Sequence, residues 1–443
     1  MLSAAFTQLT GSAIMTGFAL ALGAGPAAIG LLASLPLLAR LSQLYISWRI
    51  ERAGRWPRSA FLGAMVGRLS IAIAIAFVFL PVRNEVRLAA LIAAMTLSSI
   101  GTATFDLAFL TWMAELVPRR IRNGFFANRA RTQGVFAMTV ALTAAALLDR
   151  WRAGHPGSLT GFAAVFAVAL GFGAVSLVVL RMIPHPRRQQ SRIEPVRLRD
   201  ALAGPVRDTS FRALLRFGAV FGVGIGLLTT HLTVYMLTEL HLPFIAVTAL
   251  SATSTIATAA TSRFWGRLGD HFGTRTVVYA GALLLCTNPL MMLGVPTLGV
   301  WLVVAMHLLS GIGTGAFTAP VNTLVMSVAP PSARASYLAT FVAVYGAGQA
   351  VGAMLGGGTL RAATAVGLSA GEGFAVLFTV AALTRLGGSQ LLGYFRENGA
   401  APVAHMIRVV ARATGMSAPP VDPLLRYGSL HLARLADFIA RDR

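Results

Sequence analysis

The sequence predicts an all-α integral membrane protein, with twelve transmembrane helices arranged as two similar six-helix bundles. Composition, the length of the apolar runs and an internal repeat support this prediction. Of the 443 residues, 56% are hydrophobic and only 12% are charged, and the mean hydropathy is +0.71. A soluble chain of this length needs a far more polar surface, so the chain belongs in a membrane.

Twelve apolar runs follow one another along the chain, most of them about 20 residues long, which is the length needed to cross a bilayer. We interpret the first run as a membrane helix and not as a cleaved signal peptide, because no basic region precedes it. The runs cover residues 3–23, 27–47, 59–81, 88–115, 130–149, 159–181, 211–238, 244–263, 276–294, 298–328, 336–358 and 371–395.

The basic residues are all arginine and are unevenly placed. The net charge of +22 alone would fit a nucleic-acid binder, but the 37 arginines lie mostly in gaps between apolar runs, so we expect no nucleic-acid partner. Of these, 29 lie in the gaps after even-numbered runs and in the C-terminal tail, and five lie in the opposite gaps. The positive-inside rule then predicts that both termini lie in the cytoplasm. We expect a multi-pass protein of the plasma membrane, which in bacteria is the inner membrane.

An internal repeat divides the chain in two. When the sequence is shifted by 212 residues, "LSSIGTATF" at 97–105 lies over "LSGIGTGAF" at 309–317, and 12 of 42 positions match over 93–134. Each half has an even number of crossings, so both halves have the same orientation. We expect bundles at 1–181 and 211–395, a cytoplasmic linker at 182–210, and an amphipathic tail at 396–443 that lies on the membrane surface.

A glycine-containing loop follows the second run of each half. The second-half loop, "GRLGDHFGTR", carries the motif G-x-x-x-D-x-x-G-x-R at Gly266, Asp270, Gly273 and Arg275. The first-half loop, "WRIERAGRWPR", keeps Gly54 and Arg55, has Glu51 in place of the aspartate, and follows Ser47 in place of the first glycine. With two six-helix halves and such a loop after the second run of each half, the chain resembles the major facilitator superfamily of secondary transporters over about residues 1–395.

The resemblance implies that these loops act as a conformational latch. Asp270 would face the start of helix 11 near Arg334, and Glu51 would face the start of helix 5 near Arg122. A carboxylate near a helix N-terminus contributes about 0.3–2 kcal/mol, which is weak enough to break in each transport cycle. The alternative, that these are solvated carboxylates and arginines that only set topology, stays open.

The resemblance also implies a function, which is transport of a small solute by alternating access, driven by protons. The arginine in helix 4 and the Gly-Pro pair in helix 5 that are typical of drug exporters in this family are absent. A receptor or an assembly factor on the same scaffold is the alternative, because fold does not fix function. We expect no enzyme activity, because the chain lacks the lysine of a P-loop and any clear nucleophile–base pair.

A charge inside an apolar run costs at least about 2.5 kcal/mol, and three such charges lie at a similar depth. Arg40, Arg68 and Asp106 each lie nine or ten residues from a cytoplasmic helix end, a depth of about 13–15 Å at 1.5 Å per residue. They form either a structural ion pair or a site for a proton or an anionic solute. The surplus positive charge favours an anionic solute.

Polar residues in the second half are further candidates for the solute or proton pathway. His231 and Tyr235 lie one turn apart in helix 7, and His307 and Asn322 lie in helix 10. A histidine suits a proton-coupled cycle, but it can also be held by a neighbouring hydroxyl such as that of Thr230. We expect no metal site, no cofactor and no partner besides solute, protons and membrane lipid, and a monomer.

Overall fold

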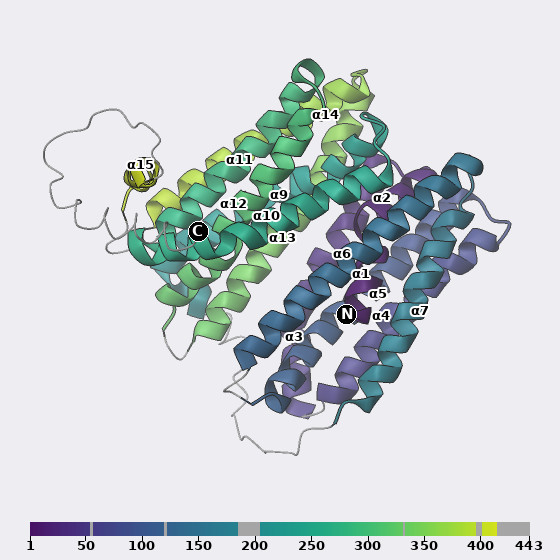
Figure 1. Cartoon of the computed structure of the whole chain (residues 1–443), viewed down its shortest axis with the longest axis horizontal. Helices are drawn as coiled ribbons and strands as arrows, with labels where there is room; N and C mark the ends of the chain where they lie inside the picture. The colour runs from purple at the N-terminus through teal and green to yellow at the C-terminus, as the bar shows by residue number, and fades with distance from the viewer. Residues whose placement is uncertain (54–55, 119–121, 185–203, 331–332, 396–400, 414–443) are drawn as a thin grey trace, which may run out of the picture.

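The computed structural model describes residues 1–53, 56–118, 122–184, 204–330, 333–395 and 401–413. Within these ranges the regular structure is helical, and the helices form two bundles side by side (Figure 1). The first bundle contains α1 (Leu2–Leu9), α2 (Ser12–Ala21), α3 (Pro26–Ala53), α4 (Trp56–Phe79), α5 (Asn84–Leu116), α6 (Arg122–Gly154) and α7 (Thr160–Met182). The second contains α9 (Thr209–Thr238), α10 (Phe244–Phe272), α11 (Thr274–Leu298), α12 (Trp301–Val328), α13 (Arg334–Ala365) and α14 (Ala370–Leu391), followed by η1 (Leu392–Tyr394) and α15 (Val403–Ala413).

The predicted crossings correspond to these helices. Ten described helices are long and apolar enough to span a membrane, namely α4–α7 and α9–α14. The 28-residue α3, which contains Arg40, and the pair α1–α2 complete six crossings in each bundle. Several helices extend beyond the predicted runs, and α6 starts at Arg122, not at residue 130. Hydropathy marks only the part of a helix that lies in the hydrocarbon core, whereas the helical backbone hydrogen bonds continue beyond it into the polar headgroup region.

The first crossing is not one continuous helix, contrary to the prediction for residues 3–23. Gly11 has extended backbone angles (φ −121°, ψ −167°) between α1 and α2 and ends the hydrogen-bond ladder of α1. The Thr10 hydroxyl donates to the carbonyl of Phe6 (2.8 Å) at the end of α1. Glycine loses more conformational freedom than any other residue when it enters a helix, and only proline is less favourable in a helix interior. The break therefore occurs at Gly11.

The repeat is visible in the helix ends. α5 and α12 end at the cap residues Val117 and Ala329. These two residues are 212 apart (329 − 117), the shift found in the sequence. The two bundles are therefore pseudo-symmetric in the register that the repeat predicts.

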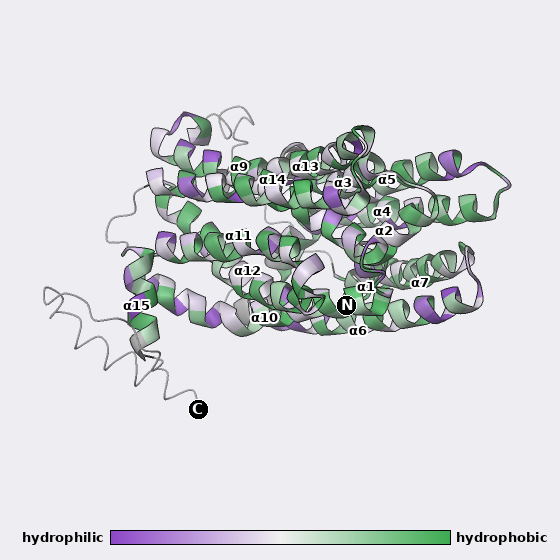
Figure 2. Cartoon of the chain, turned by 90° about the horizontal axis from the view of Figure 1, so that it is seen from above, coloured by the Kyte–Doolittle hydropathy of each residue, from purple (hydrophilic) through white to green (hydrophobic). Residues whose placement is uncertain are grey.

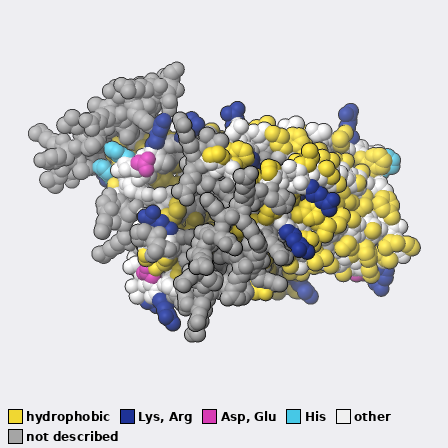
Figure 3. All heavy atoms as spheres, turned by 90° about the horizontal axis from the view of Figure 1, so that it is seen from below, with side chains coloured by type: hydrophobic (Ala, Val, Ile, Leu, Met, Phe, Trp, Pro, Cys, Tyr) yellow, Lys and Arg dark blue, Asp and Glu magenta, His cyan; other side chains and the backbone are white. Residues whose placement is uncertain are grey.

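The helix ends fall at two opposite ends of the molecule. We call the end at which α3, α5, α7, α10 and α12 finish the Arg-rich end, and the opposite end the far end. Figure 2 shows mainly hydrophobic helices, and Figure 3 shows hydrophobic side chains over much of the described surface on one face. Exposed apolar residues on the spans, such as Val178 and Leu383, fit a lipid-facing surface.

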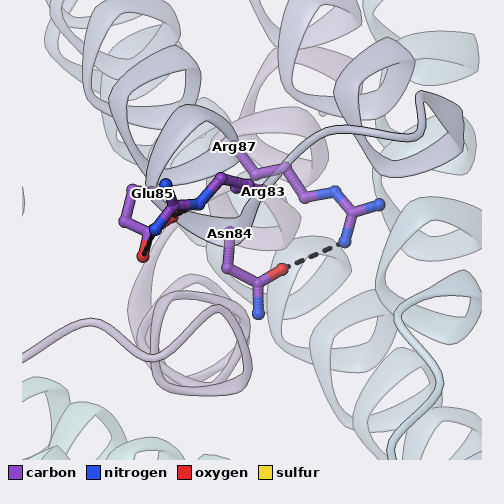
Figure 4. A network of polar contacts seen from close by, with 4 residues as sticks. All are labelled: Arg83, Asn84, Glu85 and Arg87. Atoms are coloured by element: carbon purple, nitrogen blue, oxygen red, sulfur yellow. Dashed lines mark hydrogen bonds and ion pairs between the residues drawn. The ribbon is translucent and has the colours of Figure 1, made fainter.

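At the far end, the connection between α4 and α5 carries an exposed polar network (Figure 4). Arg83 Nε lies 3.1 Å from Glu85 Oε2, and both side chains are more than 70% exposed. Arg87 donates to Asn84 Oδ1 (3.0 Å) and to the carbonyl of Leu80 (2.9 Å), near the end of α4. Exposed ion pairs contribute about 0–1 kcal/mol, so Glu85 serves below as a control position.

The first part of the tail packs on the second bundle. α15 lies across the ends of the spanning helices (Figures 1 and 2), and Met406 packs in a cluster with Trp265 and Phe272. The Ala401 N–H donates to the carbonyl of Phe272 (2.8 Å), and Thr276 donates to the Ala401 carbonyl. Most of the predicted linker and the rest of the tail lie outside the described residues.

Close packing of α9 against α13 depends on glycines that repeat every fourth residue. A Cβ on Gly226 would clash with the Gln349 carbonyl oxygen, and one on Gly352 would clash with the Val223 carbonyl oxygen. Helices approach this closely in membranes only where side chains are small.

Replacing Gly226 by alanine should therefore push α9 and α13 apart. We expect Gly226→Ala to lower the free energy of unfolding by about 1–3 kcal/mol, as for other overpacked cores. Thermal unfolding of the purified protein measures this. Gly387→Ala is the control, since a Cβ on Gly387 in α14 would meet nothing within 4 Å. Equal stability of the two variants would contradict the packing argument.

Candidate functional site

In the part of the chain that the structure describes, the hydrophobic core shared by the two bundles lies at the far end. One large cluster there includes Phe18 and Phe162 of the first bundle and Leu228, Phe244 and Phe378 of the second. Three further clusters lie toward the Arg-rich end, and each is confined to one bundle. Among the described residues, the bundles are thus packed together at the far end and form separate cores at the Arg-rich end.

A carboxylate from the first bundle caps a helix of the second at the far end. Asp149 Oδ1 accepts the backbone N–H of Phe244 (3.0 Å), and Asp149 Oδ2 accepts that of Ile245 (2.8 Å). The cap residue of α10 is Pro243, whose side chain cannot accept these bonds. A carboxylate at a helix N-terminus is favourable because the first N–H groups lack partners within the helix.

Aromatic and glycine contacts surround this cap. The Arg152 guanidinium lies over the Phe244 ring (5.2 Å to the centroid), which packs edge-on against Phe162 (5.9 Å between centroids). A Cβ on Gly17 would clash with the Phe244 ring. α3 and α13 also meet at this end, where Gly357 lies against the Pro26 carbonyl. None of these contacts was predicted from the sequence.

A cavity of about 310 Å³ lies between α1, α5 and α6 in the first bundle. If the protein transports a solute, polar residues from helices 1, 4, 7 and 10 should line a central space. The cavity has residues from the first and fourth crossings together with α6, and none from α9 or α12. Its polar lining consists of Ser3, Thr7, Gln8, Asp106, Arg129 and Gln133.

The three charges singled out in the sequence occupy different positions around this cavity. Asp106 is exposed in the cavity wall, while Arg40 is exposed on α3. Arg68 is only 5% exposed, donates to Ser3 Oγ (3.0 Å) and lies over the rings of Phe6 (5.7 Å) and Phe105 (4.9 Å). No arginine among the described residues forms an ion pair with Asp106, although Arg40, Arg68 and Arg129 act on it electrostatically.

Arg129 is a lining residue that the sequence analysis missed. It was counted among the arginines of the gap after the fourth run, because the fifth run was predicted to begin at residue 130. In the structure it lies within α6, and its guanidinium is 4.7 Å from the centroid of the Phe109 ring. The pair Arg129 and Gln133, four residues apart and hence on one helix face, was the signal that could have revealed it.

The second-half candidates lie away from the described cavity. His231 is completely buried, Nδ1 bonds the Leu227 carbonyl (3.1 Å) and not Thr230, and its ring lies against Gly356. Tyr235 packs edge-on between Phe374 and Phe378 in the far-end core.

His307 and Asn322 both lie on α12. His307 is buried, and its Nδ1 bonds the Val303 carbonyl (2.8 Å). Asn322 is half-buried. The structure therefore gives both histidines a backbone partner one turn earlier.

The structure describes the second-half latch loop, and the proposed latch contact is not formed in it. Gly273 has φ +93°, a conformation that favours glycine, and it joins α10 directly to α11. Arg275 donates to the carbonyls of Leu392 and Gly393 (3.2 Å each) at the end of the second bundle. Asp270 and Arg334 are both exposed, and no ion pair joins them.

Gly266 is exposed near the end of α10. In the first-half loop, Gly54 and Arg55 lie outside the described residues, as do the side chains of Glu51 and Arg122. The two proposed latches can therefore be compared with the structure only in the second half.

Comparison with known proteins decides the family. A model of the Major Facilitator Superfamily matches residues 1–353 and 218–397. The chain belongs to the Major Facilitator Superfamily. As a member, it is a multi-pass membrane protein of a transporter family, with the two-bundle fold predicted from its repeat. No curated protein sequence matches it significantly.

Solved structures share this fold at low sequence identity. A point mutant of the nucleoside transporter NupG is 14% identical, with a TM-score of 0.71 over 89% of this chain and 98% of that one. A bacterial homologue of the iron transporter ferroportin, in the inward-facing state, is 14% identical (TM-score 0.68; 89% and 96% covered). The inward-open xylose transporter XylE from E. coli is 13% identical (TM-score 0.64; 92% and 98% covered).

Removing the Asp149 carboxylate should loosen the far end. We expect Asp149→Ala to remove about 1–3 kcal/mol of contact between the bundles, since two N–H groups at the start of α10 lose their charged acceptor. A cysteine at the buried far-end position Ala24, in a Cys286→Ser background, should then react several-fold faster with a membrane-impermeant maleimide. Glu85→Gln is the matched control, and an unchanged labelling rate in Asp149→Ala would refute the role of this cap.

Proposed function

We propose that the protein is a secondary active transporter that moves a small solute by alternating access and is coupled to protons. The division of the hydrophobic core carries this proposal. One cluster joins the bundles at the far end, and separate clusters fill each bundle at the Arg-rich end. This is the arrangement expected of a protein in which one bundle rocks against the other, closed at one end.

The distribution of arginine supports placing the Arg-rich end in the cytoplasm, as it would lie in a bacterial inner membrane. On this orientation the structure is in an inward-facing state. The unpaired Asp270 and Arg334 fit that state, because a cytoplasmic latch would be broken in it. The similar ferroportin homologue and XylE structures are themselves described as inward-facing and inward-open.

The Asp149 cap then acts as the latch of the outer side. It joins the bundles in the inward-facing state and must break when the outer side opens. The Asp270 loop acts in the other state of the cycle: its contact with the start of α13 forms only when the cytoplasmic side closes. The two carboxylates thus stabilise alternate states by the same interaction, a carboxylate against a helix N-terminus.

Asp106 is the group we assign to proton exchange. It is a carboxylate within a membrane-spanning helix, exposed in a cavity wall, where charged groups usually serve ion or substrate pathways. Arg40, Arg68 and Arg129 act electrostatically on its charge. Movement of these helices would weaken that field and let the carboxyl group take up a proton.

Asp106→Asn tests the coupling. We expect the variant to fold, to lose solute accumulation driven by a proton gradient, and to keep solute exchange at equal, saturating concentrations on both sides. Reconstituted proteoliposomes with an internal pH indicator measure both activities. Glu85→Gln, which removes an exposed carboxylate, should behave as wild type. Proton-driven transport at the wild-type rate in Asp106→Asn would remove Asp106 from the mechanism.

Asp270→Asn tests the cytoplasmic latch. The variant should fold normally, favour the inward-facing state and transport several-fold more slowly, because the closed state loses about 0.3–2 kcal/mol. A cysteine introduced at Gln133 in the cavity should be alkylated faster in the Asp270→Asn variant than in the protein that keeps Asp270. If alkylation and transport both stay unchanged, Asp270 is an ordinary solvated carboxylate.

A further inference from the structure

The charged groups that line the cavity differ from those that the sequence emphasised. Only Asp106 and Arg129 of the described charged residues line it. Arg68 lies behind the wall, with its guanidinium bonded to Ser3, and Arg40 lies outside the lining. The lining thus carries one negative and one positive charge, although the wider surroundings carry a surplus of positive charge.

The two lining charges are close but not paired. Arg129 lies over the ring of Phe109, which is one turn along α5 from Asp106, yet no ion pair joins the guanidinium to the carboxylate. The aromatic face holds the Arg129 cation in place without using its N–H donors. Both groups therefore keep hydrogen-bonding capacity that a bound molecule can use.

Neutral polar groups complete the lining. Gln8 and Gln133 provide carboxamides, and Ser3 and Thr7 provide hydroxyls. A volume of about 310 Å³ is at the lower end of the range for small-molecule sites, which favours a solute of a few carbon atoms.

Resting on the transporter function proposed above, we propose that this cavity binds a small zwitterion, with its ammonium group on Asp106 and its carboxylate on Arg129. A solute with only a carboxylate would lie beside the unpaired Asp106 anion and be repelled. A solute with only an ammonium group would leave Arg129 unsatisfied and be repelled by it. A solute with both charges can pair with the Asp106 carboxylate and the Arg129 guanidinium at once. The lining therefore favours a zwitterion over the anion suggested by the sequence.

A series of unbranched solutes tests the charge requirement, and within it 4-aminobutyrate has the same chain length as the two single-charge analogues. We would measure binding to the purified protein by ligand-induced thermal shift for glycine, 3-aminopropionate and 4-aminobutyrate, with butyrate and butylamine as single-charge analogues. At least one zwitterion should bind at least about tenfold more tightly than both analogues, as expected for a lost charge-assisted hydrogen bond. Butyrate binding as tightly as every zwitterion, or no binding by any zwitterion, would overturn the proposal.

Two variants assign the two ends of the solute. Asp106→Asn should abolish the preference over butyrate, and Arg129→Gln should abolish the preference over butylamine. Arg131→Gln, which neutralises an exposed arginine on the same helix, and Glu85→Gln should keep both preferences. Arg129→Lys keeps the charge and should restore the preference if Arg129→Gln loses it. An Arg129→Gln variant that folds and keeps the wild-type preferences would contradict the assignment.

The outcome can be separated from failure of the transporter function. Spin-label distances between the bundles at the two ends report alternating access without any knowledge of the solute. If the two ends alternate but no zwitterion binds, only the zwitterion proposal fails. If the distances never change, the proposed transport function fails first.

Discussion

Asp149 makes the contact on which the arrangement of the two bundles depends. α10 begins after a proline that offers its first N–H groups no acceptor, and the carboxylate that satisfies them comes from the other bundle. The surrounding far-end contacts bury apolar surface, and the hydrophobic effect that stabilises them is strong but non-directional. The cap adds direction, because two N–H groups must meet two carboxylate oxygens. It fixes how α6 and α10 meet, and so holds the far end closed.

Closure at one end accounts for the exposure of the site. With the bundles joined at the far end, the hydrophobic clusters that the described residues form toward the Arg-rich end each lie within one bundle, and no ion pair joins Asp270 to Arg334. Asp106 and Arg129 are then exposed to a cavity although both belong to membrane-spanning helices. A carboxylate and a guanidinium that are near each other but unpaired are costly in such surroundings. A bound zwitterion, or a proton on Asp106, would reduce that cost, which links occupancy of the cavity to the state of the two ends.

The fold could be predicted from the sequence because lipid imposes simple rules. Apolar length gives the crossings, and the 212-residue repeat, which also separates the ends of α5 and α12, gives the two bundles. The site could be predicted only in part. Asp106 and Arg68 stand out as charges in apolar runs, whereas Arg129 was hidden because hydropathy places it in a loop. The break at Gly11 and the Asp149 cap depend on local backbone geometry and on contacts between bundles, neither of which appears in a hydropathy pattern.

Double electron–electron resonance between spin labels on α6 and on, or just before, α10 tests the central claim most directly. One label pair would be placed at Ala153 and His241 at the far end, and another at Asn128 and Ser262 at the Arg-rich end, all exposed positions, in a Cys286→Ser background. On protonation, or on binding of a transported solute, the account predicts a second population in which the far-end distance lengthens while the Arg-rich distance shortens. Asp149→Ala should increase that population, and Asp270→Asn should decrease it. Distances that stay fixed at both ends, or that lengthen together, would contradict alternating access by this chain.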